Sequence, residues 1–343
     1  MRVASAKRAA IFACVLSYVL AGGTGSHAQT VEEFYRGKQV RFIIHSAAGG
    51  TYDAWARLVG PYLTKYVPGN PVFVPQNMPG AGGIVAANFL YNRAPSDGSL
   101  IGMVGRNVPS QAVMKVKNIT FDPRKFNWIG NPEMGATVCV VVGTASVKSA
   151  QELFKQEIPV GGAGAGSAVS IMPVFLRNLF GMKFKLIEGY GSQSAIFLAI
   201  ERGEVQGTFA TLTSVQTTHP GALESGELRV LFNMERTPVA ELKAPSIFEF
   251  AKTDEQRQLL ALMSVSSEVG RPMLAPPGVP ADRVAALRKA FDAAMEDPKL
   301  KADAKKIGLP VTNYMSGTKL QGIIDNLMAT PDSVIAKMNA LTR

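Results

Sequence analysis

Segments with the pattern of β-strands alternate with segments of helical periodicity along most of this chain. Residues 40–45 (VRFIIH) are rich in β-branched and aromatic side chains, and residues 54–66 follow with apolar residues at helical spacing. Further strands are expected at 71–76, 100–104, 138–142, 158–160, 184–187, 205–210 and 229–232, and further helices at 84–92, 151–155, 169–180, 194–202 and 281–294. This alternation indicates βαβ units, largely parallel sheets and an α/β fold.

The C-terminal part has a different pattern. The sequence APPGVP at 275–280 interrupts regular structure, and Asp282 is expected to cap a helix that begins near Arg283. From there the chain reads as helical, with breaks at Pro298, at 308–310 and at Pro331. Helices without strands of their own cannot bury a core alone, so we expect them to pack on an earlier sheet.

The first 28 residues have the features of an export signal. Basic residues near the start precede an apolar stretch at 9–20, and Ser26 and Ala28 are small residues at the −3 and −1 positions of a cleavage site. A membrane anchor is the alternative, but the stretch is short and lacks a stop-transfer flank. A lipoprotein would need a cysteine after the apolar stretch, whereas Cys14 lies inside it. We therefore expect cleavage after Ala28 and a periplasmic location.

Composition excludes several classes of site. Removal of 28 of the 343 residues leaves 315 residues and lowers the formal net charge from +10 to +7, because the segment holds three basic and no acidic residues. The one remaining cysteine, Cys139, lies in an apolar strand pattern and is expected to be a buried small hydrophobe. With three histidines in the whole chain, neither a cysteine nor a histidine metal centre is expected, and no cofactor. The basic residues are scattered rather than interleaved with aromatics, which argues against a nucleic-acid partner and supports a weak bias toward anionic ligands.

Two glycine-rich turns, at 46–53 (SAAGGTYD) and 161–167 (GGAGAGS), each join a strand to a helix. Glycine lets the backbone approach a ligand closely, and the free N–H groups of a helix's first turn bind anionic oxygen, whether phosphate or carboxylate. Asp53 is also a good N-cap residue. The candidate binding residues in these turns are Ala48, Gly49, Gly50, Thr51 and Asp53 in the first, and Gly164, Ala165, Gly166 and Ser167 in the second.

Neither turn matches a nucleotide-binding fingerprint, since the second reads G-x-G-x-G-S and the chain contains no Gly-Lys-Ser/Thr. A nucleophilic hydrolase is disfavoured as well. There is no G-x-S-x-G motif, and only His45 and His219 remain as a base after cleavage. His45 is expected to serve in packing or as a polar ligand contact. No catalytic residue is therefore predicted.

Several sequence blocks resemble the solute-binding receptors of tripartite tricarboxylate transporters, the Bug family. The most distinctive are NMPGAGG at 77–83 and APSDG at 94–98. The others are AAGGTYD at 47–53, the turn at 161–167, EGY at 188–190, AIERGEV at 199–205 and RPMLAPPGVP at 271–280. The resemblance thus extends over nearly all of the chain after the export signal.

The resemblance implies a type II-like periplasmic binding protein, in which two α/β lobes are joined by two crossover segments. Lobe one would comprise residues 29–134 and 264–343, and lobe two residues 135–263. The two glycine-rich turns would face each other across the cleft and hold one carboxylate, partly through water. Closure of the lobes would signal to the membrane components of the transporter. The protein would be a monomer and not an enzyme.

Some positions depart from the family pattern and leave the ligand open. After Tyr190 the chain reads GSQSA, where a proline near 191 and a polar or acidic residue near 195 would be expected. Candidate distal contacts are Arg106, Asn107, Tyr190, Ser192 and Thr211 or Thr213. Arg106 could pair with a second carboxylate; the alternative is a surface or interlobe salt bridge. Arg271 is expected to be structural.

We therefore predict a periplasmic receptor that captures a small organic anion, most simply a carboxylate, and delivers it to a tripartite transporter. Two rivals remain open at this stage. One is a binding protein that serves a sensor or has no permease, and the other is a secreted hydrolase on a similar scaffold. Dicarboxylates, tricarboxylates, aromatic acids and neutral ligands all remain candidates.

Overall fold

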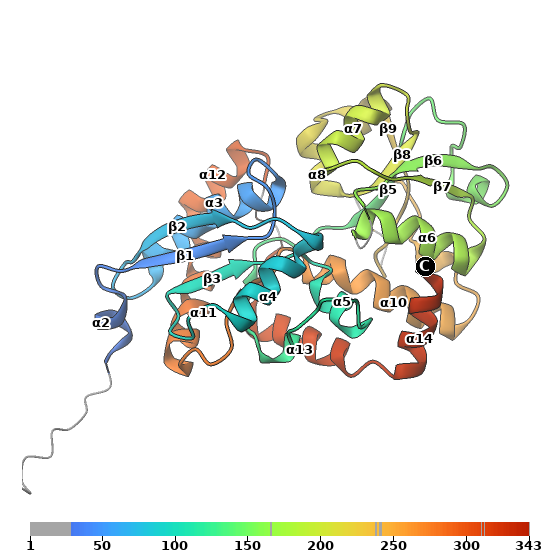
Figure 1. Ribbon diagram of the computed structural model, residues 1–343. Helices are drawn as coiled ribbons and strands as arrows, with labels where there is room; N and C mark the ends of the chain where they lie inside the picture. The colour runs from blue at the N-terminus through green and yellow to red at the C-terminus, as the bar shows by residue number, and fades with distance from the viewer. Residues whose placement is uncertain are drawn as a thin grey trace, which may run out of the picture.

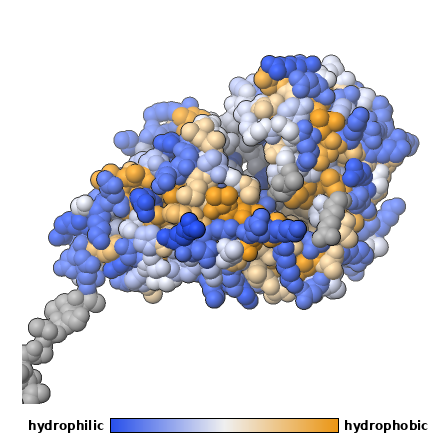
Figure 2. All heavy atoms as spheres, in the orientation of Figure 1, coloured by the Kyte–Doolittle hydropathy of each residue, from blue (hydrophilic) through white to orange (hydrophobic). Residues whose placement is uncertain are grey.

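The computed structural model describes residues 29–164, 167–236, 239, 242–309, 311 and 313–342, so the expected export signal lies outside the described residues. These residues form two α/β parts that lie side by side, each built on its own sheet (Figure 1). The space-filling view shows a hollow where the two parts meet (Figure 2). Among the described helices, none combines the length and apolarity that crossing a membrane requires.

The first sheet has six strands, which are, in order across the sheet, β11 (Met315–Ser316), β4 (Asn127–Asn131), β10 (Met273–Ala275), β3 (Leu100–Met103), β1 (Gln39–Ile44) and β2 (Val72–Asn77). Strand β1 is parallel to both β2 and β3. Strand β10 is antiparallel to β3 and β4, and β11 is antiparallel to β4.

The second sheet has five strands, which are, in order, β7 (Phe184–Ile187), β6 (Ile158–Gly161), β8 (Gly207–Thr211), β5 (Thr137–Val142) and β9 (Leu228–Asn233). Strand β6 is parallel to β7 and β8, whereas β5 is antiparallel to β8 and β9. The α/β class and the two-lobed type II-like architecture are confirmed. The expectation of largely parallel sheets holds only in part, because β5 and β10 each enter from the other sheet and run against their neighbours.

Helices cover both sheets. Those that contact the first sheet, or each other beside it, are α2 (Val31–Tyr35), α3 (Thr51–Tyr66), α4 (Ile84–Asn92), α5 (Val108–Val113), α11 (Ala281–Glu296), α12 (Pro298–Lys306) and α13 (Gly317–Met328). Those that contact the second sheet are α6 (Ala168–Phe180), α7 (Gln193–Glu201), α8 (Leu212–Thr218) and α9 (Ala222–Ser225). Short 3₁₀ turns occupy Ala81–Gly83, Pro123–Lys125, Ala150–Phe154 and Ile247–Phe250, so the helix expected at 151–155 is a 3₁₀ turn.

The C-terminal helices pack back on earlier elements, as the break at 275–280 suggested. Helix α11 lies against α3 and β4, where the Phe291 ring occupies the space that a side chain at Gly130 would need. The last helix, α14 (Asp332–Leu341), packs against α6, and Ile335 and Met338 belong to the apolar cluster of the second sheet. Residues 264–343 therefore do not all pack with the first sheet. The expected boundaries place α14 in lobe one, whereas α14 packs against α6 beside the second sheet.

Two of the expected helix caps were misplaced. Helix α3 begins at Thr51 with Gly50 as its N-cap, and α11 begins at Ala281 with Pro280 as its N-cap. Asp53 and Asp282 therefore lie in the first turns of their helices. An acidic side chain is favourable there too, because it faces the positive end of the helix dipole.

Two segments connect the sheets. Residues 132–136 join β4 to β5, and the segment from β9 to β10 contains α10 (Asp254–Val269). Helix α10 has a complete capping box at Thr253 and Gln256, so its start is fixed by the local sequence. Cys139 is fully buried in β5, and burial raises the pKa of its thiol, as expected of a structural cysteine.

Candidate functional site

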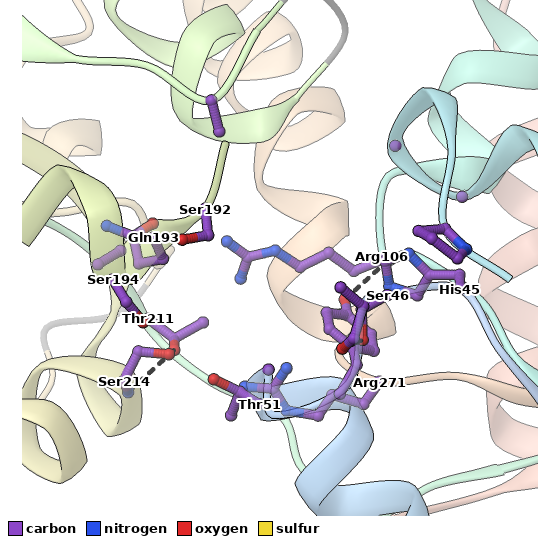
Figure 3. A pocket seen from close by; sticks show the side chains of 18 of the residues that line it. His45, Ser46, Thr51, Arg106, Ser192, Gln193, Ser194, Thr211, Ser214 and Arg271 are labelled. Atoms are coloured by element: carbon purple, nitrogen blue, oxygen red, sulfur yellow. Dashed lines mark hydrogen bonds between the residues drawn. The ribbon is translucent and has the colours of Figure 1, made fainter. Parts of the chain in front are cut away.

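A cavity of about 700 Å³ lies between the two sheets. On the side of the first sheet, its wall comes from the loop after β1, the loop after β3 and the residues that follow α10. On the opposite side it comes from the starts of α7 and α8 (Figure 3). The carboxyl ends of β1, β3, β6 and β8 thus point to one cavity, which is where open α/β sheets bind ligands.

The turn at 46–53 presents the start of α3 to this cavity. Ala48, Gly49, Gly50 and Thr51 all line it, and their predicted contact with a ligand stays a prediction. Asp53 does not. The Asp53 residue is 5% exposed. Its carboxylate accepts hydrogen bonds from the Gly49 N–H (3.0 Å) and from the Arg57 and Asn77 side chains (2.9 Å each).

Asp53 therefore stabilises the turn through hydrogen bonds and does not line the cavity. Burial opposes its ionisation, but the hydrogen bonds from Arg57, Gly49 and Asn77 hold the pKa of the carboxyl below its usual value. Since Gly49 gives its N–H to Asp53, the donors left for a ligand are the first-turn amides of α3, which have no acceptor within the helix.

The turn at 161–167 contributes less than expected among the described residues. Ala163 lines the cavity, whereas Gly164 and Ser167 are not part of its wall. Ser167 caps α6 instead, since its Oγ accepts from the Ser170 N–H (3.3 Å) and donates to the Ser170 Oγ (3.0 Å). Ala165 and Gly166 lie outside the described residues, so the predicted role of this turn stays a prediction.

On the side of the second sheet, the start of α7 forms more of the cavity wall than the turn at 161–167 does. Gly191, Ser192, Gln193 and Ser194 line the cavity opposite the start of α3 (Figure 3). Ser192 is the N-cap of α7, and its Oγ accepts from the Ala195 N–H (3.2 Å). Ser192 was a predicted contact; Gly191, Gln193 and Ser194 were not.

Thr211, a predicted ligand contact, lines the cavity together with Ser214. The Thr211 Oγ1 accepts from the Ser214 N–H (3.1 Å) and donates to the Ser214 Oγ (2.7 Å). Its hydroxyl is therefore engaged in capping α8, and the Ser214 hydroxyl keeps a hydrogen to donate.

Arg106 enters the cavity from the loop after β3, and its side chain extends toward Ser192 and Gln193 (Figure 3). Its Nη1 donates to the Thr137 Oγ1 (3.2 Å), and its backbone N–H donates to the Tyr52 hydroxyl (3.1 Å). No carboxylate of the described residues lies within 4.0 Å of the guanidinium, so the interlobe salt bridge considered above does not form in that part of the chain. Burial lowers the pKa of Arg106, but an arginine stays charged at neutral pH.

A buried ion pair closes the end of the cavity where the two connecting segments meet. Arg271 Nε donates to Glu133 Oε2 at 2.5 Å, and each side chain is 6% exposed. Asn131 Oδ1 accepts from the backbone N–H groups of Arg271 (2.9 Å) and Glu133 (3.0 Å). Arg271 is structural, as expected, because it links the two segments, and it also lines the cavity.

Tyr52 and His45 pack beside Arg271 in the cavity wall. The Arg271 guanidinium carbon lies 4.7 Å from the centroid of the Tyr52 ring. The His45 ring packs edge-on against the same Tyr52 ring, with 4.1 Å between their centroids. The His45 Nε2 is buried without a hydrogen-bond partner among the described residues. Burial, helped by the positive charge of Arg271, lowers the pKa of His45 to about 4, so the imidazole is neutral at pH 7.

This shift predicts a pH dependence of stability. In the unfolded chain His45 titrates near 6.5, whereas in the folded protein it stays neutral down to about pH 4. Between these values the unfolded chain binds the additional proton, so the free energy of unfolding falls as the pH decreases. We expect His45 to account for a loss of up to about 3 kcal/mol from pH 6.5 to 4.

Urea denaturation of the protein and of His45→Gln at several pH values from 7.5 to 4 measures this loss. The variant should lose less stability than the original protein over the interval. Parallel curves for the two proteins would contradict a neutral buried His45.

Three of the candidate contacts lie elsewhere. Asn107 borders a separate small cavity of about 30 Å³ between α5, α6 and α10. The Tyr190 hydroxyl donates to Glu204 Oε2 (3.2 Å), and Tyr190 does not line the main cavity. Thr213 does not line it either.

The polar side chains that sequence reasoning missed as cavity residues include Tyr52, Glu133, Gln193, Ser194 and Ser214, and His45 was named only as a possible polar contact. Two of them had a usable signal. His45 and Glu133 follow directly after β1 and shortly after β4, and ligand sites form outside the ends of such strands. Among the described residues, no group of three or more His, Cys, Asp or Glu side chains is placed to hold a metal ion.

Comparison with known proteins gives a family match. The family model described as "Tripartite tricarboxylate transporter family receptor" matches residues 56–340. A UPF0065 protein of Cupriavidus necator is 26% identical over 320 residues, which cover 91% of this chain and 90% of that protein. The receptor family indicated by the sequence blocks is thereby confirmed.

Solved structures agree in fold. MatC of Rhodopseudomonas palustris, solved with bound malate, is 18% identical and aligns with a TM-score of 0.66 over 89% of this chain and 99% of that chain. A second R. palustris protein, solved with adipate, is 20% identical with a TM-score of 0.66 over 88% of this chain and 97% of that one. At these sequence identities, the similarity shows a shared fold.

Proposed function

The chain belongs to the family of periplasmic solute-binding receptors of tripartite tricarboxylate transporters, and from this premise we propose that it captures a small organic anion bearing a carboxylate and delivers it to the membrane components of such a transporter. The family consists of receptors that bind solutes without transforming them, in agreement with the prediction that the protein is not an enzyme. We further propose that the first 28 residues direct export to the periplasm, where the protein acts as a monomer.

The observation that carries this proposal is the charge around the cavity. Arg106 and Arg271 contribute two positive charges, and Glu133 contributes one negative charge that is already paired with Arg271. His45 is neutral. The guanidinium of Arg106 is left with a neutral hydrogen-bond partner, Thr137, while Glu133 and Glu235 attract it only from beyond ion-pair distance. A ligand carboxylate in direct contact would compensate its charge.

The start of α3 supports the same ligand. The residues at the start of α3 line the cavity across from those at the start of α7, and each helix start carries partial positive charge. A cavity of about 700 Å³ is in the range of small-molecule sites. Two proteins of the same fold were solved with the dicarboxylates adipate and malate, which is in keeping with an acid of three to eight carbons here.

Isothermal titration calorimetry tests the ligand class. The protein is titrated with mono- and dicarboxylates of three to eight carbons and with the neutral amides of the same acids as controls. We expect saturable binding of one or more acids and none of the corresponding amide, because only the carboxylate compensates Arg106. Equal binding of acid and amide, or binding of neither, would contradict the proposal.

A further inference from the structure

The backbone of Arg106 is held by a side chain from another element. Its N–H donates to the hydroxyl of Tyr52 (3.1 Å), which lies in the first turn of α3. The same hydroxyl donates to the carbonyl oxygen of Gly270 (3.4 Å), which directly follows α10. Tyr52 therefore connects three parts of the cavity wall, namely the start of α3, the loop after β3 and the second connecting segment.

The Tyr52 hydroxyl is attached to a ring that is itself fixed. The His45 ring packs edge-on against the Tyr52 ring, and the Arg271 guanidinium lies over it. The hydroxyl's acceptor, Gly270, lies on constrained backbone. Its φ is 60°, and a Cβ at this position would collide with the carbonyl oxygen of Glu133, so only glycine fits there. The Tyr52 hydroxyl therefore has little freedom to move.

Arg106 depends on such a fixed point because its side chain is long and has to cross the cavity. The side chain extends toward Ser192 at the start of α7 (Figure 3), and its Nη1 donates to the Thr137 Oγ1 (3.2 Å). The position of the Arg106 backbone sets the direction in which the whole side chain leaves the loop. A guanidinium that is ordered before a ligand arrives binds that ligand at a lower cost in conformational entropy.

We propose that Tyr52 is a positioning residue for ligand binding: its hydroxyl fixes the backbone of Arg106, so that the guanidinium already points into the cavity when a carboxylate enters. The inference rests on the proposed function, because it takes Arg106 to bind the ligand carboxylate. Tyr52 acts through Arg106, since its hydroxyl both accepts and donates within the protein.

Tyr52→Phe tests this role, because it removes the hydroxyl and keeps the ring on which His45 and Arg271 pack. The probe is the tightest-binding acid among propionate, hexanoate, succinate and adipate. Its affinity is measured by calorimetry or, for millimolar dissociation constants, by NMR titration. We expect binding to weaken about three- to tenfold, because the guanidinium of the variant has to be ordered as the acid binds.

A double-mutant cycle with Arg106→Gln separates positioning from a general structural effect. In the Arg106→Gln background, Tyr52→Phe should change the affinity by less than about twofold, because no guanidinium is left to position. An equal loss in both backgrounds would overturn the proposal, since the hydroxyl would then act on the ligand or on the fold independently of Arg106. An affinity unchanged by Tyr52→Phe alone would overturn it as well.

Tyr62→Phe is the matched control. Tyr62 lies on the same helix, and its hydroxyl donates to Asp303 Oδ2 (2.7 Å) outside the cavity wall. This variant should bind the acid as the original protein does.

Hydrogen exchange of the Arg106 amide in the ligand-free protein gives a second measurement. Exchange should be faster in Tyr52→Phe than in the original protein and unchanged in Tyr62→Phe. Equal exchange in the two variants would contradict the positioning role. Loss of the Tyr52 effect while an acid still binds would leave the carboxylate receptor in place, whereas failure of every acid to bind would overturn the proposed function and this inference with it.

Discussion

Replacement of Arg106 by glutamine is expected to weaken carboxylate binding by roughly 30- to 1000-fold, which corresponds to about 2–4 kcal/mol. The guanidinium is partly buried in the cavity wall, and among the described residues its side-chain hydrogen-bond partner is the neutral hydroxyl of Thr137. Its interaction with a ligand carboxylate would therefore be poorly screened by water and would not compete with an internal ion pair. Calorimetric titration with the tightest acid of the panel measures the loss.

The same substitution should leave the fold intact, because it removes a charge that burial disfavours. The melting temperature of the ligand-free variant should equal or exceed that of the original protein. Arg93→Gln, at an exposed position away from the cavity, is the matched control and should bind normally. If Arg106→Gln bound the acid as tightly as the control does, Arg106 would have no part in recognition.

Arg106→Lys separates charge from geometry. The ammonium of lysine retains the positive charge but cannot form the two parallel hydrogen bonds of a guanidinium with a carboxylate. An affinity between those of the original protein and Arg106→Gln would indicate bidentate pairing.

The second large effect concerns stability. Arg271→Met is expected to lower the free energy of unfolding by about 3–5 kcal/mol, because it leaves Glu133 ionised, buried and without its partner. The double variant Arg271→Met/Glu133→Leu removes both charges and should recover most of this loss, since a buried ion pair is readily replaced by apolar side chains of similar size. Urea denaturation without ligand at pH 7 gives the three values.

Lys115→Met provides the comparison for an ion pair in solvent. Lys115 and Asp332 are 3.2 Å apart, but their side chains are 73% and 86% exposed, so breaking this pair should have little effect. A double variant as unstable as Arg271→Met alone would show that packing of the arginine, including its contact with the Tyr52 ring, outweighs the charge of Glu133.

The regular elements of this protein were largely predictable because their signal is local. The β-branched run at 40–45 and the helical spacing after it correspond to β1 and α3 within a few residues, and the helix expected at 84–92 is α4. Strands β4, β10 and β11 were missed. They have five residues or fewer, and they are strands because distant segments supply their neighbours in the first sheet. No pattern within such short segments records those partners.

The same distinction applies to the cavity. Ala48–Thr51 could be predicted because the glycines, the preceding strand and the following helix are contiguous in the sequence. Ser192 and Thr211 are N-caps whose identity is also local. The pairing of Glu133 with Arg271, 138 residues away, and the unpartnered state of Glu133 Oε1 could not be predicted in this way.

The sequence by itself thus determined the α/β class, the order of the main elements, the receptor family and one of the helix starts that line the cavity. The tertiary structure decided which groups surround the cavity: α7 opposes α3, and within the described chain Arg106 lacks an ion-pair partner and the buried Glu133 Oε1 lacks a hydrogen-bond donor. The reason is physical. Helix capping and apolar periodicity act over a few residues, whereas charge compensation and burial depend on which remote segments meet when the two sheets assemble.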